Sequence, residues 1–343
     1  MLWIVLAVVL LLLLAVAWVG VRGVLAKGHL ENAVADVGTL RSQLGSGDTD
    51  GALKTASHLQ DEAGAARSLT ADPIWGASQY VPFFGTNLRA VRQVSVVVDH
   101  IATGAIKPVS GVVGEVGTDS FAPKDGKVDL EPLVRAQAPV QQAATTIDKA
   151  KQDADAIDVS GTLSPVTSAV NQLRNALLSV SSQVDVANRV VQLAPAMLGR
   201  DGDRRYLLLF QNNAELRAGG GIPGAVALLN VQDGGIALQD QRSGSSFGPY
   251  PESVLPLDDG TKGLYGDITG RYMQDVTLTP EFPQAAPLAA EMWRLKHRET
   301  VDGVISIDPV ALSYLLQATG PITLPTGDVL TSDDAVDLLL HDV

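Results

Sequence analysis

The sequence predicts an α+β protein with an N-terminal transmembrane helix, an antiparallel helical bundle, and an α/β domain with a mixed sheet that is truncated at its C-terminus. Three observations support this class. The chain starts with an uncharged apolar run, continues with apolar residues at heptad-like spacing, and changes to short strand-like segments after residue 199. These observations divide the chain into a membrane anchor (1–27), a helical bundle (28–199) and an incomplete α/β domain (200–343).

Composition excludes several classes of function. Because 46% of the residues are hydrophobic and 18% are charged, the chain is expected to fold rather than to remain disordered. The formal net charge of −13, without a cluster of Lys and Arg, argues against a nucleic-acid partner. The absence of cysteine excludes disulfides, thiolate zinc sites and thiol nucleophiles.

The N-terminal run predicts a contact with the lipid bilayer through residues 2–21. This run has no charged residue and is long enough to cross the hydrocarbon core as a helix. A cleaved signal peptide is the alternative, but signal peptides usually have a shorter apolar core and a positive n-region. We therefore favour a retained, single-pass anchor. Arg22 and Lys27 follow the span, so the positive-inside rule taken alone would place the remainder in the cytoplasm. Two charges are too few to decide the orientation.

Two apolar seams predict the best-defined helices of the bundle. One helix is expected to begin at Ser164-Pro165, with an N-cap residue followed by proline at the first helical position. Its seam consists of Val166, Val170, Leu173, Leu177, Val180, Val184, Ala187 and Val191. An earlier seam, rich in alanine, consists of Leu133, Ala136, Val140, Ala143, Ile147, Ala150, Ala154 and Ile157. We interpret both seams as core packing.

Two further segments, 29–70 and 86–116, show weaker helical periodicity. Between them lies a corner rich in proline and aromatic residues, made of Pro73-Ile74-Trp75 and Tyr80-Val81-Pro82-Phe83-Phe84. Such a bundle next to a membrane suits either a stalk or a sensor module.

Short apolar segments after residue 199 predict a sheet. Tyr206–Phe210 is a continuous apolar run typical of a buried strand. Ala225–Val231 and Gly235–Gln239 flank Gln232-Asp233-Gly234, which predicts a hairpin because Asp-Gly tolerates positive φ. Val304–Ile307 is expected to form another strand.

Helix signals follow these strands. Asp308-Pro309 predicts the start of a helix over Val310–Ala318, and Gly320-Pro321 its end. Thr331-Ser332-Asp333-Asp334 predicts another start, with acidic groups that complement the helix dipole. This last helix reaches Val343 without a cap, which suggests a fragment.

Residues 219–224 read GGGIPG and match the G-x-G-x-x-G pattern of dinucleotide-binding loops. That loop requires a following helix to receive the pyrophosphate, whereas Ala225–Leu229 is strand-like. We therefore interpret the glycines as a turn or bulge between strands. A minority alternative is an anion-binding nest of glycine amides beside Arg217.

Other catalytic patterns are weak. Residues 244–248 read GSSFG and match G-x-S-x-G, but Pro249 and Pro251 disfavour the helix that a nucleophile elbow needs. The five histidines lack zinc-ligand spacing. Within a loose acidic series, Asp267 and Asp275 are candidate ligands for a hard cation. The sequence identifies no catalytic residue and no evident cofactor.

Three stretches together resemble a known family. They are residues 205–217 (RYLLLFQNNAELR), 275–283 (DVTLTPEFP) and 302–312 (DGVISIDPVAL). They resemble the bacterial envelope family called domain-of-unknown-function family 4012, whose biochemical activity is unknown. The resemblance implies an anchored protein whose bulk is extracytoplasmic. It also implies that Asn212, Asn213 and Glu215 shape the edge of the glycine-rich turn at residues 219–224.

The order of elements from Ala225 onward is more distantly similar to the LytR-CpsA-Psr family. Those membrane-anchored enzymes move glycopolymers from a polyprenyl-pyrophosphate carrier to the cell wall, and an arginine holds the pyrophosphate. Arg242 matches that arginine, but Ser243 replaces the acidic residue of the motif. Since guanidinium groups suit bidentate binding of phosphate oxygens, Arg217, Arg242 and Arg271 are candidate anion-binding residues.

Three functions remain open. We favour a binding or assembly role in cell-envelope glycopolymer biology, without catalysis. The second is a transferase of the LytR-CpsA-Psr type, which would require a divalent cation such as Mg²⁺ to offset the phosphate charge. The third is a sensor whose bundle transmits a signal; almost no chain precedes the span to receive one.

Overall fold

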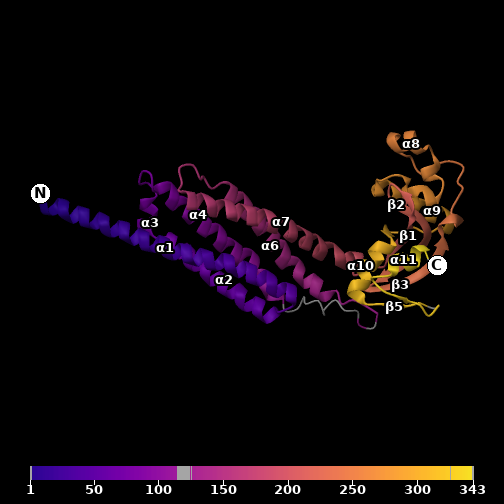
Figure 1. Ribbon diagram of the computed structural model, residues 1–343, viewed down its shortest axis with the longest axis horizontal. Helices are drawn as coiled ribbons and strands as arrows, with labels where there is room; N and C mark the ends of the chain where they lie inside the picture. Colours follow the sequence, from indigo (N-terminus) through magenta and orange to yellow (C-terminus); the bar gives the residue numbers. More distant parts are fainter. Residues whose placement is uncertain (1, 114–123, 125, 325, 342–343) are drawn as a thin grey trace. The chain divides into compact units, whose positions relative to one another are not determined.

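Helices form the first part of the chain, and a mixed sheet with helices forms the second (Figure 1). This computed structural model describes residues 2–113, 124, 126–324 and 326–341. The chain divides into two compact units, residues 1–195 and 196–343. The observed class is α+β, as the sequence predicts.

The first unit is a bundle of helices. Its elements are α1 (Leu2–Ser46), α2 (Thr49–Thr70), α3 (Pro73–Ser78), α4 (Gly85–Ile101), the π-helical turn η1 (Ala102–Ile106), α5 (Lys107–Val113), α6 (Glu131–Asp155) and α7 (Ser164–Met197). The sequence predicts helix up to residue 116; residues 114–116 lie outside the described residues.

Helix α1 is 45 residues long, and its first half is apolar and exposed. Among the described residues, it is the helix that is long and apolar enough to cross a membrane. Its second half packs within the bundle, where Ala26 and Ala33 are buried. The helix continues without a break past residue 27, where the sequence predicts the end of the anchor.

Small side chains let the bundle helices approach one another closely. Most of the predicted alanine-rich seam of α6 is buried, and α7 buries Val170, Leu177 and Val191 from its own seam. These residues share cores with α4, α5 and η1, to which α4 contributes Ala90, Val94 and Val97. The two seams therefore form core packing, as predicted.

The second unit contains a four-stranded sheet. Its strands are β1 (Arg204–Arg217), β2 (Gly220–Gln232), β3 (Gly235–Ser243) and β4 (Gly303–Ile307). The strand order is β3-β2-β1-β4; β1 pairs antiparallel with β2 and parallel with β4. The remaining elements are η3 (Gly244–Ser246), α8 (Asp259–Tyr265), η4 (Ile268–Gly270), η5 (Met273–Leu278), α9 (Phe282–His297), α10 (Pro309–Thr319), β5 (Ile322–Thr323), β6 (Val329–Leu330) and α11 (Ala335–His341).

The turn between β2 and β3 confirms the predicted hairpin. Asp233 and Gly234 form its centre with φ angles of 47° and 76°. Positive φ at both positions is the geometry of a type I′ turn, whose twist matches that of the strands.

One face of the sheet packs against α9 to form the main core of this unit. Strand β1 contributes Leu207 and Leu209, both fully buried, and α9 contributes Leu288, Met292 and Trp293. A smaller core, formed by Leu316, Leu330 and Ala335, joins α10, the β5–β6 pair and α11.

The predicted helix signals after β4 are confirmed. The Asp308 carboxylate accepts a hydrogen bond from the Ala311 amide at 2.7 Å, and Gly320 ends α10 with φ of 85°. At the start of α11, the Thr331 and Asp334 side chains each accept a hydrogen bond from the other's amide. The sequence predicts that this helix reaches Val343, but residues 342–343 lie outside the described residues.

Candidate functional site: the glycine turn and a polar cavity at the other end of the sheet

The glycine-rich stretch 219–224 lies in the turn between β1 and β2 and in the first residues of β2. The Gly219 amide donates a hydrogen bond to the Thr277 carbonyl at 2.8 Å, and the Thr277 hydroxyl donates one to the Gly221 carbonyl at 2.8 Å. A strand follows the glycines, where a dinucleotide-binding loop would place a helix N-terminus. The interpretation as an inter-strand turn is confirmed.

A buried glutamine explains why the chain needs glycine here. The Gln211 side chain is 7% exposed, donates a hydrogen bond to the Gly219 carbonyl and accepts one from the Gly221 amide, each at 3.1 Å. A Cβ atom on Gly220 would lie 2.2 Å from the Gln211 Oε1 atom. The glycines thus permit close backbone approach, and two of their amides already have acceptors within the protein.

Asn212, Asn213 and Glu215, which are predicted to shape the edge of the glycine-rich turn, lie in an irregular part of β1. Between Asn212 and Leu216 the pairing with β2 shifts, so that residues 213–215 have no partners on β2. The Asn212 side chain accepts a hydrogen bond from the Ala214 amide at 2.9 Å, and Asn213 donates one to the Asp308 carboxylate at 2.8 Å. Glu215 is exposed.

Asp308 therefore joins two of the three motif stretches. Burial alone would raise the pKa of its carboxyl, but hydrogen bonds from the Ala311 amide and from Asn213 lower it. Arg217 and Asp275 make a second link, with Nη2 and Oδ1 3.8 Å apart. Burial raises the pKa of Asp275, although the Arg217 guanidinium opposes this shift.

The two candidate cation ligands each lie beside a different basic side chain. Asp275 pairs with Arg217, whereas Asp267 lies 3.6 Å from the Lys262 ammonium. Across the described residues, no group of three or more His, Asp or Glu side chains is arranged to hold a metal ion.

The three candidate anion-binding arginines each have partners within the protein. Besides the Arg217 pair, Arg242 lies 2.9 Å from the Asp240 carboxylate, and the Arg271 Nε donates to the Tyr250 carbonyl at 2.8 Å. A phosphate group would therefore compete with these internal partners, and an anion site at the three arginines stays a prediction.

Residues 244–248 do not form a nucleophile elbow. They contain the 3₁₀ turn η3, and the Ser246 hydroxyl donates a hydrogen bond to the Ser243 carbonyl at 2.7 Å. Coil, rather than the helix that the elbow requires, follows this turn.

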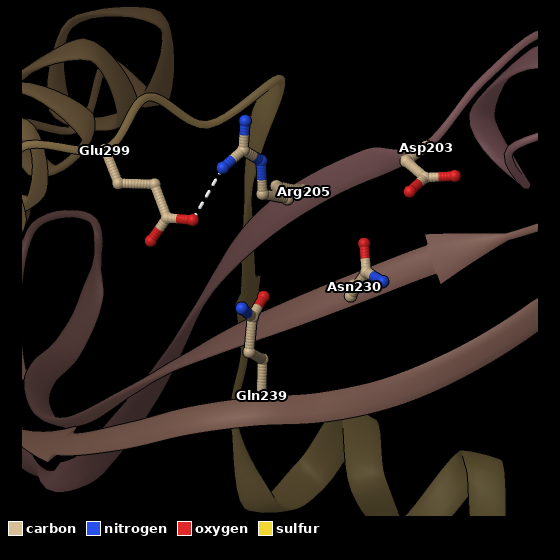
Figure 2. A pocket seen from close by; sticks show the side chains of 5 residues that line it. All are labelled: Asp203, Arg205, Asn230, Gln239 and Glu299. Carbon is tan, nitrogen blue, oxygen red and sulfur yellow. Dashed lines mark hydrogen bonds and ion pairs between the residues drawn. The ribbon is translucent and has the colours of Figure 1, made fainter.

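A polar cavity of about 280 Å³ opens at one end of the sheet (Figure 2). Five polar side chains line it: Asp203, Arg205, Asn230, Gln239 and Glu299. Arg205 and Glu299 form an ion pair of 2.5 Å, and the Arg205 backbone exchanges hydrogen bonds with Asp302. These contacts hold the guanidinium at the cavity wall.

The other cavity side chains are available to a ligand. Asp203, Asn230 and Gln239 make no side-chain hydrogen bond or ion pair with any residue that the structure describes. A carboxylate supplies acceptors, and the two amides supply both donors and acceptors. Such a set can hydrogen-bond to the hydroxyl groups of a polar, uncharged ligand.

Our sequence interpretation missed this cavity, although the strand pattern carries a signal for it. Arg205 has the same side-chain phase as the buried Leu207 and Leu209, and it lies opposite Asn230 in the β1–β2 register. Asn230 in turn shares its phase with Val226 and Leu228. A pair of polar residues in the inward phase at a strand end indicates a polar site where the apolar core stops.

A stack of rings lies at the end of α9, close in sequence to Glu299. The Trp293 and His297 ring centroids are 4.0 Å apart, and Phe247 stacks on Trp293 at 5.9 Å. Burial lowers the pKa of His297, and Arg242 and Lys296 lower it further, against Asp240 and Glu299. The lowered pKa favours the neutral form of His297, and the stack serves as packing.

The C-terminal part of the chain resembles a known family along most of the second unit. Residues 201–343 match the family model described as protein of unknown function (DUF4012). This match supports the resemblance inferred from the three motif stretches, all of which lie inside the DUF4012 region. No curated protein and no solved structure matches the chain.

The structure brings the three motif stretches into contact with one another. The first contacts the second through Arg217–Asp275 and, with the glycines that follow it, through Gly219–Thr277. It contacts the third through Asn213–Asp308 and through the hydrogen bonds that the Arg205 backbone makes with the Asp302 carboxylate and amide. The stretches thus form one connected framework, with most of its contacts at the turn end of the β1–β2 hairpin and the Arg205–Asp302 contact at the open end.

Proposed function

We propose that this chain is a membrane-anchored extracytoplasmic protein with a binding or assembly role in cell-envelope glycopolymer biology. Its α1 helix is the anchor, and the polar cavity of the second unit is the ligand site. The observation that carries the proposal is the exposed apolar first half of α1, which continues as one helix into a packed bundle.

The length of the exposed segment suits a bilayer. Among the described residues of α1, Arg22 is the first with a hydrogen bond or ion pair to the bundle: it donates to the Ser68 and Leu69 carbonyls and pairs with Asp72. At about 1.5 Å per residue, the residues before it span roughly 30 Å, the thickness of the hydrocarbon core. Water is a poor solvent for that surface and lipid a good one.

The extracytoplasmic placement rests on the family resemblance. If the chain lies outside, the hydroxyl-rich glycans of the envelope are available to the second unit. The chemistry of the cavity fits them, because amide and carboxylate groups without internal partners are suited to pair with sugar hydroxyls.

The transferase alternative depends on Arg242 and Arg271 holding carrier phosphates. Arg242 is the better placed, since its side chain is 48% exposed on the edge strand β3. A pyrophosphate would have to displace the Asp240 carboxylate from it. That competition favours the binding role over the transferase.

Thermal shifts of the full chain in detergent test the proposal. We expect soluble envelope glycan fragments to stabilise the wild-type chain. Gln239→Ala should weaken binding roughly fivefold, as expected for about 1 kcal/mol from one lost hydrogen bond. The matched control is Gln241→Ala, which removes an exposed glutamine of the same strand that does not line the cavity.

Two results would redirect the proposal. An equal loss of glycan binding in Gln239→Ala and Gln241→Ala would contradict the cavity as the ligand site. So would the absence of stabilisation by any glycan. Stabilisation by a polyprenyl-pyrophosphate glycan that requires Mg²⁺ and disappears in Arg242→Ala and Arg271→Ala would establish the transferase alternative instead.

A further inference from the structure

The corner between α3 and α4 exposes large apolar side chains to a degree unusual for a water-facing loop. Tyr80 is 85% exposed, Phe83 91% and Phe84 65%, and Val81 between them is 49% exposed. Ile74, the second residue of α3, is 42% exposed. Contiguous exposed apolar surface of this kind marks a contact with a protein or a membrane.

The backbone of the corner is held in a strained conformation. Phe83 has φ of 68°, in the left-handed region that bulky residues rarely adopt. The strain brings Phe83 no burial, because its ring is the most exposed of the corner. A strained backbone that displays an aromatic ring points to function rather than to packing.

The corner lies at the end of the bundle from which α1 projects (Figure 1). Arg22 of α1 lies 3.0 Å from the carboxylate of Asp72, which caps α3. A Cβ atom on Gly23 would lie 3.6 Å from the Trp75 ring. The loop after α6 reaches the same end, where the Leu163 amide donates to the Asn87 side chain and the Leu163 side chain is 60% exposed.

We propose that this rim, formed by Ile74, Tyr80, Val81, Phe83, Phe84 and Leu163, inserts into the interfacial layer of the bilayer that α1 crosses. The inference rests on the proposed anchoring by α1. We assign the bilayer as the partner of the rim because the rim lies beside the part of α1 where the exposed apolar segment ends. Aromatic side chains suit the headgroup region, where one part of a ring meets lipid and another meets water.

Two residues of α1, Trp18 and Arg22, also have the character of residues at a membrane interface. The Arg22 guanidinium lies over the Trp18 ring at 5.1 Å, and Trp18 is 48% exposed. Trp and Arg near the end of a span are typical interface anchors. With a second contact beside α1, the bundle would be held at a defined tilt, since a single helix alone leaves rotation about its axis free.

The absence of cysteine makes a depth measurement straightforward. Three single-cysteine variants of the full chain, Phe83→Cys, Ser46→Cys and Leu11→Cys, would carry an environment-sensitive fluorophore in vesicles of phosphatidylcholine and phosphatidylglycerol. Ser46 is exposed at the far end of α1, and Leu11 lies inside the apolar segment. Tyr80→Cys is a second rim variant that repeats the Phe83 measurement.

We expect the labels at positions 83 and 80 to show blue-shifted emission and to be quenched by lipids spin-labelled near the headgroup. The label at 46 should show neither effect, and the label at 11 should be quenched by lipids spin-labelled near the chain end. A quenched label at 11 with rim labels that behave like the one at 46 would overturn this inference alone, and would leave the rim to a protein partner. An unquenched label at 11 would overturn the anchoring and the inference with it.

Discussion

Replacing Gly221 by alanine is expected to lower the free energy of unfolding of the second unit by about 3 kcal/mol. The new Cβ atom would lie 2.3 Å from the Asn212 carbonyl oxygen and 2.5 Å from its carbonyl carbon. Neither backbone moves easily, because Gly221 is held on both sides, by Gln211 at its amide and by Thr277 at its carbonyl. To relieve the clash, Gly221 would have to move away from Gln211 or Thr277. That movement would break the connection that Gly221 makes between the first and second motif stretches.

Gly224→Ala is the matched control for this variant. Gly224 lies three residues further along β2, and a Cβ atom there would meet nothing within 4 Å. Calorimetry of the full chain in detergent should show the transition of the second unit shifted down in Gly221→Ala and nearly unchanged in Gly224→Ala. Similar transitions for the two variants would mean that the close approach at Gly221 is not required.

The second large effect is expected in the bundle, where Trp75→Ala should cost about 3–5 kcal/mol. The Trp75 side chain is 1% exposed, and its Nε1 donates a hydrogen bond to the Leu88 carbonyl at 3.1 Å. Its ring also lies against Gly23 of α1. Truncation would leave a cavity among three helices and would remove the hydrogen bond to the Leu88 carbonyl.

Trp75→Phe separates packing from hydrogen bonding. It keeps an aromatic ring but removes the donor to Leu88, so we expect a loss of about 1–3 kcal/mol from the lost hydrogen bond and the smaller ring. Thermal unfolding of the bundle, followed by far-UV circular dichroism in detergent, measures both variants. A Trp75→Ala bundle as stable as wild type would contradict the proposed stabilising contact between Trp75 and Gly23 of α1.

Local signals were enough to predict much of the fold. The Asp-Gly turn at 233–234 and the Asp-Pro start at 308–309 are confirmed because each depends on residues adjacent in sequence. The seams of α6 and α7 follow from helical periodicity in the same way. The strand predicted at Tyr206–Phe210 exists but continues to Arg217 as β1, through the irregular segment after Asn212.

The polar cavity and the apolar rim were not predicted because both depend on contacts distant in sequence. Arg205 meets Glu299 only after β1 and the end of α9 come together. The aromatic corner was visible as a sequence, but its exposure and its place beside Arg22 follow from the packing of α1 on α2 and α3. The three arginines were grouped by chemistry, whereas the fold gives each one a separate partner.

Labelling of Ser46→Cys with a membrane-impermeant maleimide, in intact cells that express the full chain, tests the central claim most directly. Ser46 is exposed at the end of α1 remote from the apolar segment, and the natural sequence has no cysteine that would react. An anchored protein with an extracytoplasmic bundle predicts equal labelling before and after lysis. Labelling that appears only after lysis would place the bundle in the cytoplasm and would contradict a role with cell-surface glycopolymers.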